Sequence, residues 1–181
     1  AFVADYRVKS RQNTGPDACV ADGKSAIRWV RKNAKRLGVD PARIAAGGGS
    51  AGGHVAAATG MCDGLDDPAE KDSGISSKAN ALLLFNPVYD NGPTGYGHAR
   101  AKKWFPAISP AHNVSRDDPP TIVFLGSKDS LIPVATAKKF DEDLKSAGVN
   151  SEIWIYDGQP HGFFNEGKNQ KAFLDTVRKM D

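Results

Sequence analysis

The segment Gly47-Gly48-Gly49-Ser50-Ala51-Gly52-Gly53 carries more information about the fold than any other part of this sequence. It follows a short apolar stretch, 43–47, that predicts a strand, and precedes an Ala-rich stretch, 51–61, that predicts a helix. A tight glycine-rich turn in this position has three interpretations: a flexible linker, a dinucleotide-binding turn, or a turn that presents a nucleophilic serine. The residues that follow it discriminate between them.

The first two interpretations are weak. A linker is badly placed here, because ordered elements flank the turn closely on both sides. Gly47, Gly49 and Gly52 do match the dinucleotide pattern G-x-G-x-x-G between a strand and a helix. That pattern also requires an acidic residue about 20 positions further on, at the end of the next strand. The acidic residues near that distance fall instead in a polar loop, 62–78: Asp66, Asp67, Glu70 and Asp72.

The third interpretation is a nucleophile elbow, in which Gly48, Ser50 and Gly52 supply the pattern G-x-S-x-G. The serine of an elbow is held in a strained backbone conformation, and the residues two positions away on each side need to be nearly free of side chains. Such a turn exposes the Ser50 hydroxyl above the sheet. It also places the Ala51 backbone N–H at a helix N-terminus, where it can stabilise the oxyanion of an acyl transfer.

An elbow serine needs a base and an orienting acid, which follow it in the order serine, acid, histidine. Asp129 comes just after the apolar stretch 121–126, and His161 comes just after the next one, 152–156. The carboxyl ends of parallel strands meet at the edge of a sheet where sites form, so these two residues are predicted to converge with Ser50. For the acid, two alternatives stay open: Asp129 could only cap the helix that follows, and Asp157 lies closer to His161 in sequence.

The remaining histidines have simpler interpretations. His54 lies one helical turn beyond Ser50 and is predicted to pack near the elbow. His98 and His112 lie in or beside a Gly-, Pro- and aromatic-rich segment, 86–111, where a solvent-exposed or substrate-wall role is expected. Four scattered histidines without a Cys/His cluster argue against a metal site, and no cofactor is predicted.

Strand-like and helix-like segments alternate, which predicts an α/β architecture with a mainly parallel sheet. We expect strands at 1–6, 43–47, 81–85, 121–126 and 152–156, and helices at 17–37, 51–61, 134–147 and 168–180. The basic face of the helix 17–37, which includes Arg28, is interpreted as solvated. The segment 86–111 is too long for a simple connection and is interpreted as a lid-like insertion in a single domain, 1–181.

Composition excludes several classes of protein. The 181 residues are about one domain's worth, and 40% of them are hydrophobic, as in an ordinary globular protein. No apolar run approaches the roughly 18 residues of a membrane span, and a net charge of +3 is too slight to indicate nucleic-acid binding. Cys19 and Cys62 allow at most one disulfide, so the chain is not a disulfide scaffold. Because Ala1 already lies in a predicted strand, we expect the natural protein to be longer at its N-terminus.

Over essentially its whole length the sequence resembles the α/β-hydrolase superfamily, in its esterase/lipase branch. The motifs that carry the resemblance are Asp5-Tyr6-Arg7, Asp40-Pro41, Gly49-Ser50-Ala51-Gly52-Gly53-His54, Gly126-x-x-Asp129 and His161-Gly162-Phe163. The sequence is similar to bacterial acetyl xylan and feruloyl esterase-like carboxylesterases, and more distantly to prolyl oligopeptidases. This resemblance implies a three-layer sandwich, with Ser50 as nucleophile, His161 as base and Asp129 as orienting acid.

One departure from the family concerns the oxyanion hole. Members of this branch carry a His-Gly-Gly-Gly-type loop upstream of the elbow, and no stretch of this sequence matches it. The resemblance therefore implies that residues 1–181 are the C-terminal two-thirds of the fold, without its N-terminal strands. We expect the missing part to come from elsewhere, for instance from a second chain.

The expected function is hydrolysis of carboxylic esters, with small-molecule or carbohydrate esters as substrates. Four aromatic residues of the lid-like segment are candidates for the substrate wall, although core packing is an equal use for them: Tyr89, Tyr96, Trp104 and Phe105. A non-catalytic hydrolase-like binding module and a serine peptidase of the prolyl-oligopeptidase type are the alternatives. Neither nucleic acid nor membrane is expected as a partner, and only a polysaccharide ester substrate would indicate a secreted or periplasmic location.

Overall fold

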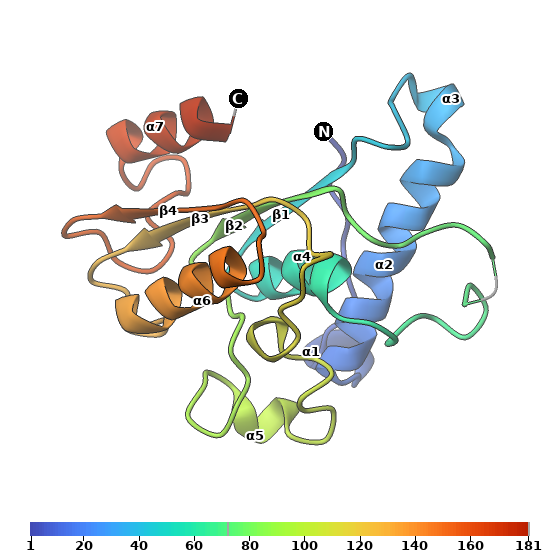
Figure 1. The fold of residues 1–181 in the computed structure, drawn as a ribbon, viewed down its shortest axis with the longest axis horizontal. Coiled ribbons are helices and arrows are strands. Elements are labelled where there is room, and N and C mark those ends of the chain that lie inside the picture. Colours follow the sequence, from blue (N-terminus) through green and yellow to red (C-terminus); the bar gives the residue numbers. More distant parts are fainter. Residues whose placement is uncertain (72, 181) are drawn as a thin grey trace.

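The computed structural model of the chain describes residues 1–71 and 73–180 (Figure 1). Its centre is a four-stranded parallel sheet in the order β1-β2-β3-β4. The strands span Ala45–Gly49, Ala81–Phe85, Thr121–Gly126 and Ser151–Tyr156. Because all four run in the same direction, their carboxyl ends lie along one edge of the sheet. This confirms the predicted α/β architecture.

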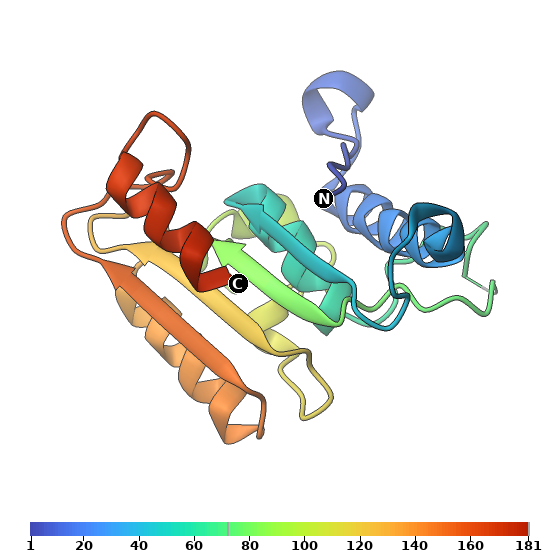
Figure 2. The same cartoon turned by 90° about the horizontal axis from the view of Figure 1, so that it is seen from above.

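Helices lie on both faces of this sheet, as Figures 1 and 2 show. One face is covered by α4 (Ala51–Met61) and α6 (Val134–Ser146), and α7 (Gln170–Met180) lies over the other. The long α2 (Pro16–Lys32) packs against α4 beyond β1. The short helical segments are α1 (Lys9–Gln12), α3 (Ala34–Leu37), α5 (His98–Ala101) and the 3₁₀ turn η1 (Pro110–His112).

The main core lies between the sheet and helices α4 and α6. Leu84 of β2 and Val123 of β3 are fully buried there, against Phe140 and Leu144 of α6. On the opposite face, side chains that include Phe124 and Ala172 form a smaller cluster under α7. A continuous apolar run such as 81–85 predicts a strand that is buried on both faces. Alternate residues of β2 are only half-buried, so this strand is fully buried on one face, which corrects that prediction.

Residues 1–6 form no strand, which corrects the prediction. A β-strand needs a neighbouring strand to satisfy its backbone hydrogen bonds, and residues 1–8 have no regular secondary structure. A groove of about 550 Å³ lies between this segment and the edge of β1, with Phe2 and Tyr6 on one side and Ala45 and Gly47 on the other. An apolar pattern alone does not show whether a partner strand is present.

The predicted helix 17–37 is two helices, which meet at Asn33. The Asn33 backbone has φ −98° and ψ 10°, and its side-chain amide donates a hydrogen bond of 2.8 Å to the Trp29 carbonyl. Asn side chains compete in this way with the backbone hydrogen bonds of a helix. The break leaves a single helical turn, α3, which ends at Gly38 in the left-handed conformation that glycine adopts without strain.

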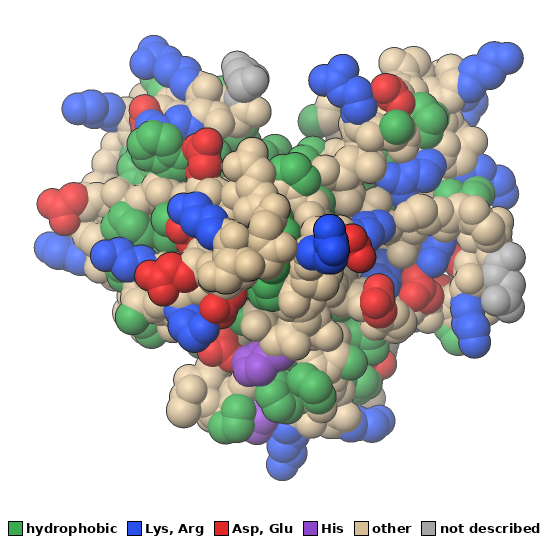
Figure 3. Space-filling view, viewed as in Figure 1, with side chains coloured by type: hydrophobic (Ala, Val, Ile, Leu, Met, Phe, Trp, Pro, Cys, Tyr) green, Lys and Arg blue, Asp and Glu red, His purple; other side chains and the backbone are tan. Residues whose placement is uncertain are grey.

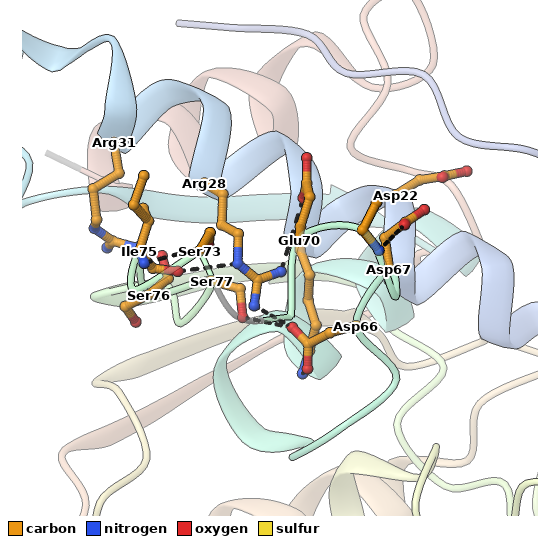
Figure 4. Close-up of polar contacts among 12 residues, drawn as sticks. Asp22, Arg28, Arg31, Asp66, Asp67, Glu70, Ser73, Ile75, Ser76 and Ser77 are labelled. Atoms are coloured by element: carbon orange, nitrogen blue, oxygen red, sulfur yellow. Dashed lines mark hydrogen bonds and ion pairs between the residues drawn. The ribbon is translucent and has the colours of Figure 1, made fainter.

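Arg28 is buried, which corrects its assignment to a solvated face. Figure 4 shows its guanidinium between Asp66 and the Ile75 carbonyl, with hydrogen bonds to both. The buried Lys24 ammonium lies 3.4 Å from the same Asp66 carboxylate. Burial acts to raise the pKa of Asp66, but the Arg28 hydrogen bond and the two positive charges outweigh it and hold the pKa below its usual value. These ion pairs anchor the polar loop 62–78 to α2.

The two cysteines are both free thiols, Cys19 half-buried and Cys62 buried. Burial raises the pKa of the Cys62 thiol to about 12. None of the helices in the described ranges combines the length and the apolar character needed to cross a membrane.

Candidate active site

Ser50 lies in the turn between β1 and α4, with φ 55° and ψ −117°. A positive φ is uncommon for any residue other than glycine, so this serine has the strained backbone that an elbow requires. Its N–H donates to the Phe85 carbonyl at 2.9 Å, and its carbonyl accepts from Val88 N–H at 3.2 Å and His54 N–H at 3.1 Å. The segment that follows β2 therefore holds the Ser50 backbone on both sides.

The glycines around Ser50 allow the turn to close. A Cβ at Gly48 would lie 2.6 Å from the backbone carbonyl group of Gly52, and a Cβ at Gly53 would lie 2.9 Å from Pro87. Both contacts are shorter than carbon atoms tolerate, so glycine is needed at both positions. A Cβ at Gly52 would meet open space. The predicted need for glycine is thus confirmed at Gly48 and wrong at Gly52.

Asp129 and His161 are in direct contact. The His161 Nδ1 atom lies 2.8 Å from Asp129 Oδ2, and the Asp129 side chain is fully buried. Asp129 Oδ1 accepts the backbone N–H groups of Leu131 at 2.8 Å and Ile132 at 3.0 Å. Burial acts to raise the pKa of Asp129, but the hydrogen bonds from His161, from these two amides and from Asn86 outweigh it and lower the pKa. The carboxylate therefore caps a turn with one oxygen and binds the histidine with the other.

The rival acid, Asp157, is exposed and has a different partner. Its Oδ1 accepts a hydrogen bond of 3.1 Å from the Ser127 hydroxyl, which in turn accepts the Gly158 N–H at 2.8 Å. Asp157 therefore stabilises the turn after β4. Its proximity to His161 in sequence does not translate into contact with the imidazole.

The loop that carries His161 also packs against the elbow. The Phe164 ring occupies the space beside Gly49, where a Cβ would lie 2.2 Å from the ring, and it lies 5.1 Å from the Phe85 ring. The Ser50 hydroxyl does not cap α4, and in residues 1–71 and 73–180 it makes no hydrogen bond to His161. Contacts of this kind often tighten only when substrate binds.

The same contacts exclude the dinucleotide interpretation. Phe164 fills the space in front of Gly49 that a pyrophosphate would need. Asp66, one of the acidic residues at the expected distance, is paired with Arg28. The residue directly after β2 is the amide Asn86 and not the carboxylate that would bind a ribose.

Ala51 is the first residue of α4 and is exposed, so its N–H is one of the unpaired donors of the helix N-terminus, beside Ser50.

His54, one turn further on, is buried, and its Nε2 lies 2.8 Å from the Ile108 carbonyl. Burial lowers the pKa of His54, which keeps the imidazole neutral at pH 7. This residue joins the elbow helix to the segment 86–111, in agreement with its predicted packing role.

The aromatic residues predicted for a substrate wall are dispersed. Tyr89 is 1% exposed and stacks on Phe140 in the core, with ring centroids 4.6 Å apart, which corrects its assignment to the wall. Tyr96 is 38% exposed and lies under the Arg100 guanidinium. Trp104 packs against the smaller core cluster that includes Val20.

Phe105 lies between two histidine rings, His98 at 5.9 Å and His112 at 4.8 Å between centroids. Contact of Tyr96, Trp104 or Phe105 with a substrate stays a prediction, as does the lid-like role of residues 86–111. Within the ranges that the structure covers, no three His, Cys, Asp or Glu side chains are grouped closely enough to hold a metal ion.

Sequence reasoning missed Asn86. Its side-chain amide is fully buried and donates to Asp129 Oδ2, the oxygen that also binds His161. The signal that located Asp129 and His161 was available for this residue too, because Asn86 is the first residue after the carboxyl end of β2.

Comparison with known proteins identifies the family. The model of the BD-FAE family matches residues 1–91, half of the chain, and that of the dienelactone hydrolase family matches residues 94–179. The chain is a member of the α/β-hydrolase esterases. A structure of Thermogutta terrifontis esterase 2 phosphoramylated by tabun has a TM-score of 0.91 and 46% identity, covering 98% of this chain and 67% of that one.

Further relatives agree with this assignment. The propionate-bound Thermogutta terrifontis esterase has a TM-score of 0.88 and 44% identity, over 98% of this chain and 68% of that one. Esterase LipC of Mycobacterium tuberculosis is 31% identical over 180 residues, and Esterase LipQ of the same organism is 33% identical over 160. These alignments cover 88% and 78% of this chain. The chain spans less than half the length of these two relatives, 44% and 37%.

Proposed function

We propose that this chain carries the catalytic residues of a serine carboxylic-ester hydrolase. Ser50 is the nucleophile, His161 the general base and Asp129 the orienting acid. The observation that carries the proposal is the 2.8 Å contact between His161 Nδ1 and the buried Asp129 carboxylate, at the same sheet edge as the strained Ser50 turn. The names of the relatives, most of which are esterases, agree with it.

The first half-reaction forms an acyl-enzyme. Because His161 Nδ1–H donates to Asp129, its Nε2 is left as an acceptor for the Ser50 proton. Ser50 Oγ bonds to the ester carbonyl carbon, and the carbonyl electron pair moves to oxygen, where the Ala51 N–H stabilises it. When the carbonyl re-forms, the bond to the alcohol oxygen breaks and the alcohol takes its proton from His161.

The second half-reaction returns the enzyme. His161 Nε2 takes a proton from water, and the hydroxide oxygen bonds to the acyl carbon. Collapse of this intermediate breaks the bond to Ser50 Oγ, which recovers its proton from His161, and releases the acid. In both halves the Asp129 charge stabilises the protonated imidazole.

We propose that the remaining oxyanion donors come from a polypeptide segment that binds beside β1. β1 is the edge strand of the described sheet, and the groove of about 550 Å³ along it reaches Gly48 and Gly52 of the elbow. Loss of one oxyanion donor costs on the order of 10²–10³ in kcat. We therefore expect slow turnover by residues 1–181 alone and faster turnover when a second chain, or an N-terminal extension, supplies this segment.

For the substrate, we propose esters with short acyl groups. Thermogutta terrifontis esterase 2, at 44% identity, has been solved with propionate and with butyrate bound. Carbohydrate esters are the finer proposal: Endo-1,4-beta-xylanase B of Butyrivibrio fibrisolvens, whose name concerns xylan, is 25% identical over 153 residues. Parallel hydrolysis assays with p-nitrophenyl acetate and with acetylated xylan distinguish a general preference for short acyl groups from a preference for carbohydrate esters.

Paraoxon labelling tests the nucleophile without requiring turnover. Ser50 Oγ would displace p-nitrophenol from phosphorus and retain one diethylphosphoryl group, which intact-mass and peptide mass spectrometry detect. The matched control is Ser127→Ala, which removes a serine hydroxyl at the same sheet edge. We expect one label on Ser50 in the parent chain and in S127A, and none in S50A. Labelling that persists in S50A, or no label on Ser50 in the parent chain, would contradict the proposal.

A further inference from the structure

Asn86 lies in the turn between the candidate nucleophile and the candidate acid. It is the first residue after β2, and its neighbours hold the elbow: the Phe85 carbonyl accepts the Ser50 N–H at 2.9 Å, and the Val88 N–H donates to the Ser50 carbonyl at 3.2 Å. Its own side-chain amide donates to Asp129 Oδ2. One short turn, 85–88, therefore contacts both the serine loop and the acid loop.

Asn86 itself is rigidly held. Its side chain is fully buried, and its backbone N–H donates to the Phe124 carbonyl of β3 at 2.8 Å. The backbone φ is 43°, a left-handed conformation that Asn adopts more readily than most residues. The next residue, Pro87, packs against the backbone at Gly53 in α4. The amide is therefore fixed relative to both the sheet and the elbow helix.

The orientation of the amide is set by its donor group. Asn86 Oδ1 is buried without a hydrogen-bond partner among the described residues, although buried polar atoms are normally paired. Exchanging the two amide atoms would place this oxygen against Asp129 Oδ2, where two acceptors repel each other. The Asn86 side chain thus leaves its acceptor unpaired and keeps its donor on the carboxylate.

We infer that Asn86 is a positioning residue, which holds Asp129 Oδ2 in line with His161 Nδ1; this inference rests on the proposed function. Asp129 Oδ1 is fixed by two backbone N–H groups, whereas the donors to Oδ2 within residues 1–71 and 73–180 are both side chains, Asn86 and His161. The Asn86 donor fixes the Oδ2 lone pairs independently of the imidazole, so the histidine meets a carboxylate whose orientation is already set.

The test compares N86D, N86G and the control N13D by the rate at which paraoxon labels Ser50 at several pH values. Asn13 also has a positive φ, 54°, but is exposed and lies after α1, so N13D makes the same chemical change at a comparable backbone. At a pH high enough to ionise the introduced carboxyl, we expect about tenfold or more slower labelling in N86D, because its charge repels Asp129. We expect unchanged labelling in N13D.

The pH dependence within N86D separates positioning from a general structural role. The introduced carboxyl, once protonated, can donate to Asp129 as the amide does, so the deficit should shrink as the pH falls. The other titratable groups around Asp129 are His161 and the buried Tyr89. Burial and the Asp129 charge both raise the pKa of the Tyr89 hydroxyl. N86G removes the donor without strain at positive φ and should show a deficit that does not depend on pH. A pH-independent deficit in N86D, or labelling of N86G as fast as that of N13D, would overturn the inference.

A second measurement is independent of the serine chemistry. The His161 Nδ1 proton gives a downfield proton NMR signal only while its hydrogen bond to Asp129 protects it from exchange with water. We expect this signal in the parent chain and N13D, and its broadening or loss in N86D and N86G. An unchanged signal in both Asn86 variants overturns the positioning role. Failure of the parent chain to label at Ser50, with the signal present and sensitive to Asn86, contradicts the proposed esterase chemistry instead.

Discussion

Asp129→Asn replaces the buried carboxylate by a group of the same shape. Four donors point at the Asp129 carboxylate: two backbone N–H groups on Oδ1, and the Asn86 and His161 side chains on Oδ2. An amide offers one acceptor oxygen and one NH₂ group. Its best orientation keeps the oxygen on the two backbone amides, which turns the NH₂ toward His161 Nδ1.

His161 must then present Nδ1 as an acceptor and carry its proton on Nε2. In that tautomer Nε2 cannot accept the Ser50 proton, so general base catalysis is lost while the backbone stays in place. The equivalent change in a serine protease lowers kcat about 10⁴-fold, which corresponds to roughly 5 kcal/mol of transition-state stabilisation. We expect a loss of that order in p-nitrophenyl acetate hydrolysis and in the rate of paraoxon labelling.

Asp157→Asn is the matched control, because it makes the same substitution at the rival acid, which binds Ser127 and lies on the surface. We expect D157N to retain the parent rates, and circular dichroism to show that both variants are folded. A loss below tenfold in D129N, or a larger loss in D157N than in D129N, would refute the assignment of Asp129 as the orienting acid.

The remaining predictions concern stability, measured by urea unfolding. Gly48→Ala should lower the free energy of unfolding by about 1–3 kcal/mol, because its methyl group would meet the backbone of Gly52. Gly52→Ala, in open space on a helix, should leave the free energy of unfolding unchanged or raise it by up to about 1 kcal/mol. Equal effects of the two substitutions would contradict the elbow geometry. Arg28→Met should lower the free energy of unfolding by about 3 kcal/mol or more, since it leaves the Asp66 carboxylate without its main partner. The control Lys35→Ala, on the exposed side of α3, should change the free energy of unfolding by no more than about 0.5 kcal/mol. The pKa of Asp66 is lowered in the folded state, so the ion pair stabilises fully above the unfolded pKa, roughly 3.9, and this contribution is lost as the pH falls through the folded pKa. The advantage of the parent chain over R28M should therefore shrink as the pH falls from neutral to below the unfolded pKa. An advantage that stays constant would exclude this ion pair as its source.

Local patterns were enough to locate most of the secondary structure. The helix 51–61 and the strands 81–85 and 121–126 have the predicted bounds, because hydrophobic periodicity and glycine-rich turns act over a few residues. The same local chemistry predicts the strained backbone at Ser50, since a strand that turns directly into a helix at G-x-S-x-G leaves the serine few conformations. Parallel topology then explains why Asp129 and His161 lie at one sheet edge.

Other features depend on neighbours that no local pattern contains. Residues 1–6 are as apolar as a strand, but no adjacent strand in the described structure pairs with them. Arg28 follows the periodicity of an exposed basic face, yet the loop 62–78 folds over it and supplies Asp66. Tyr89 lies in an aromatic-rich loop segment and stacks in the core on Phe140, 51 positions further on in α6.

Residue types, spacing and chain order alone indicated an elbow serine, an acid and a histidine at the carboxyl ends of three parallel strands, because each of these signals is local to one strand end. The fold decided between Asp129, the acid that the family resemblance implied, and the nearer Asp157. The fold alone placed Asn86 on the same carboxylate oxygen as the histidine. The physical reason is that these contacts join loops 32 and 43 positions apart. Their separation in space is set by the order and register of the strands, which a single strand-end motif does not specify.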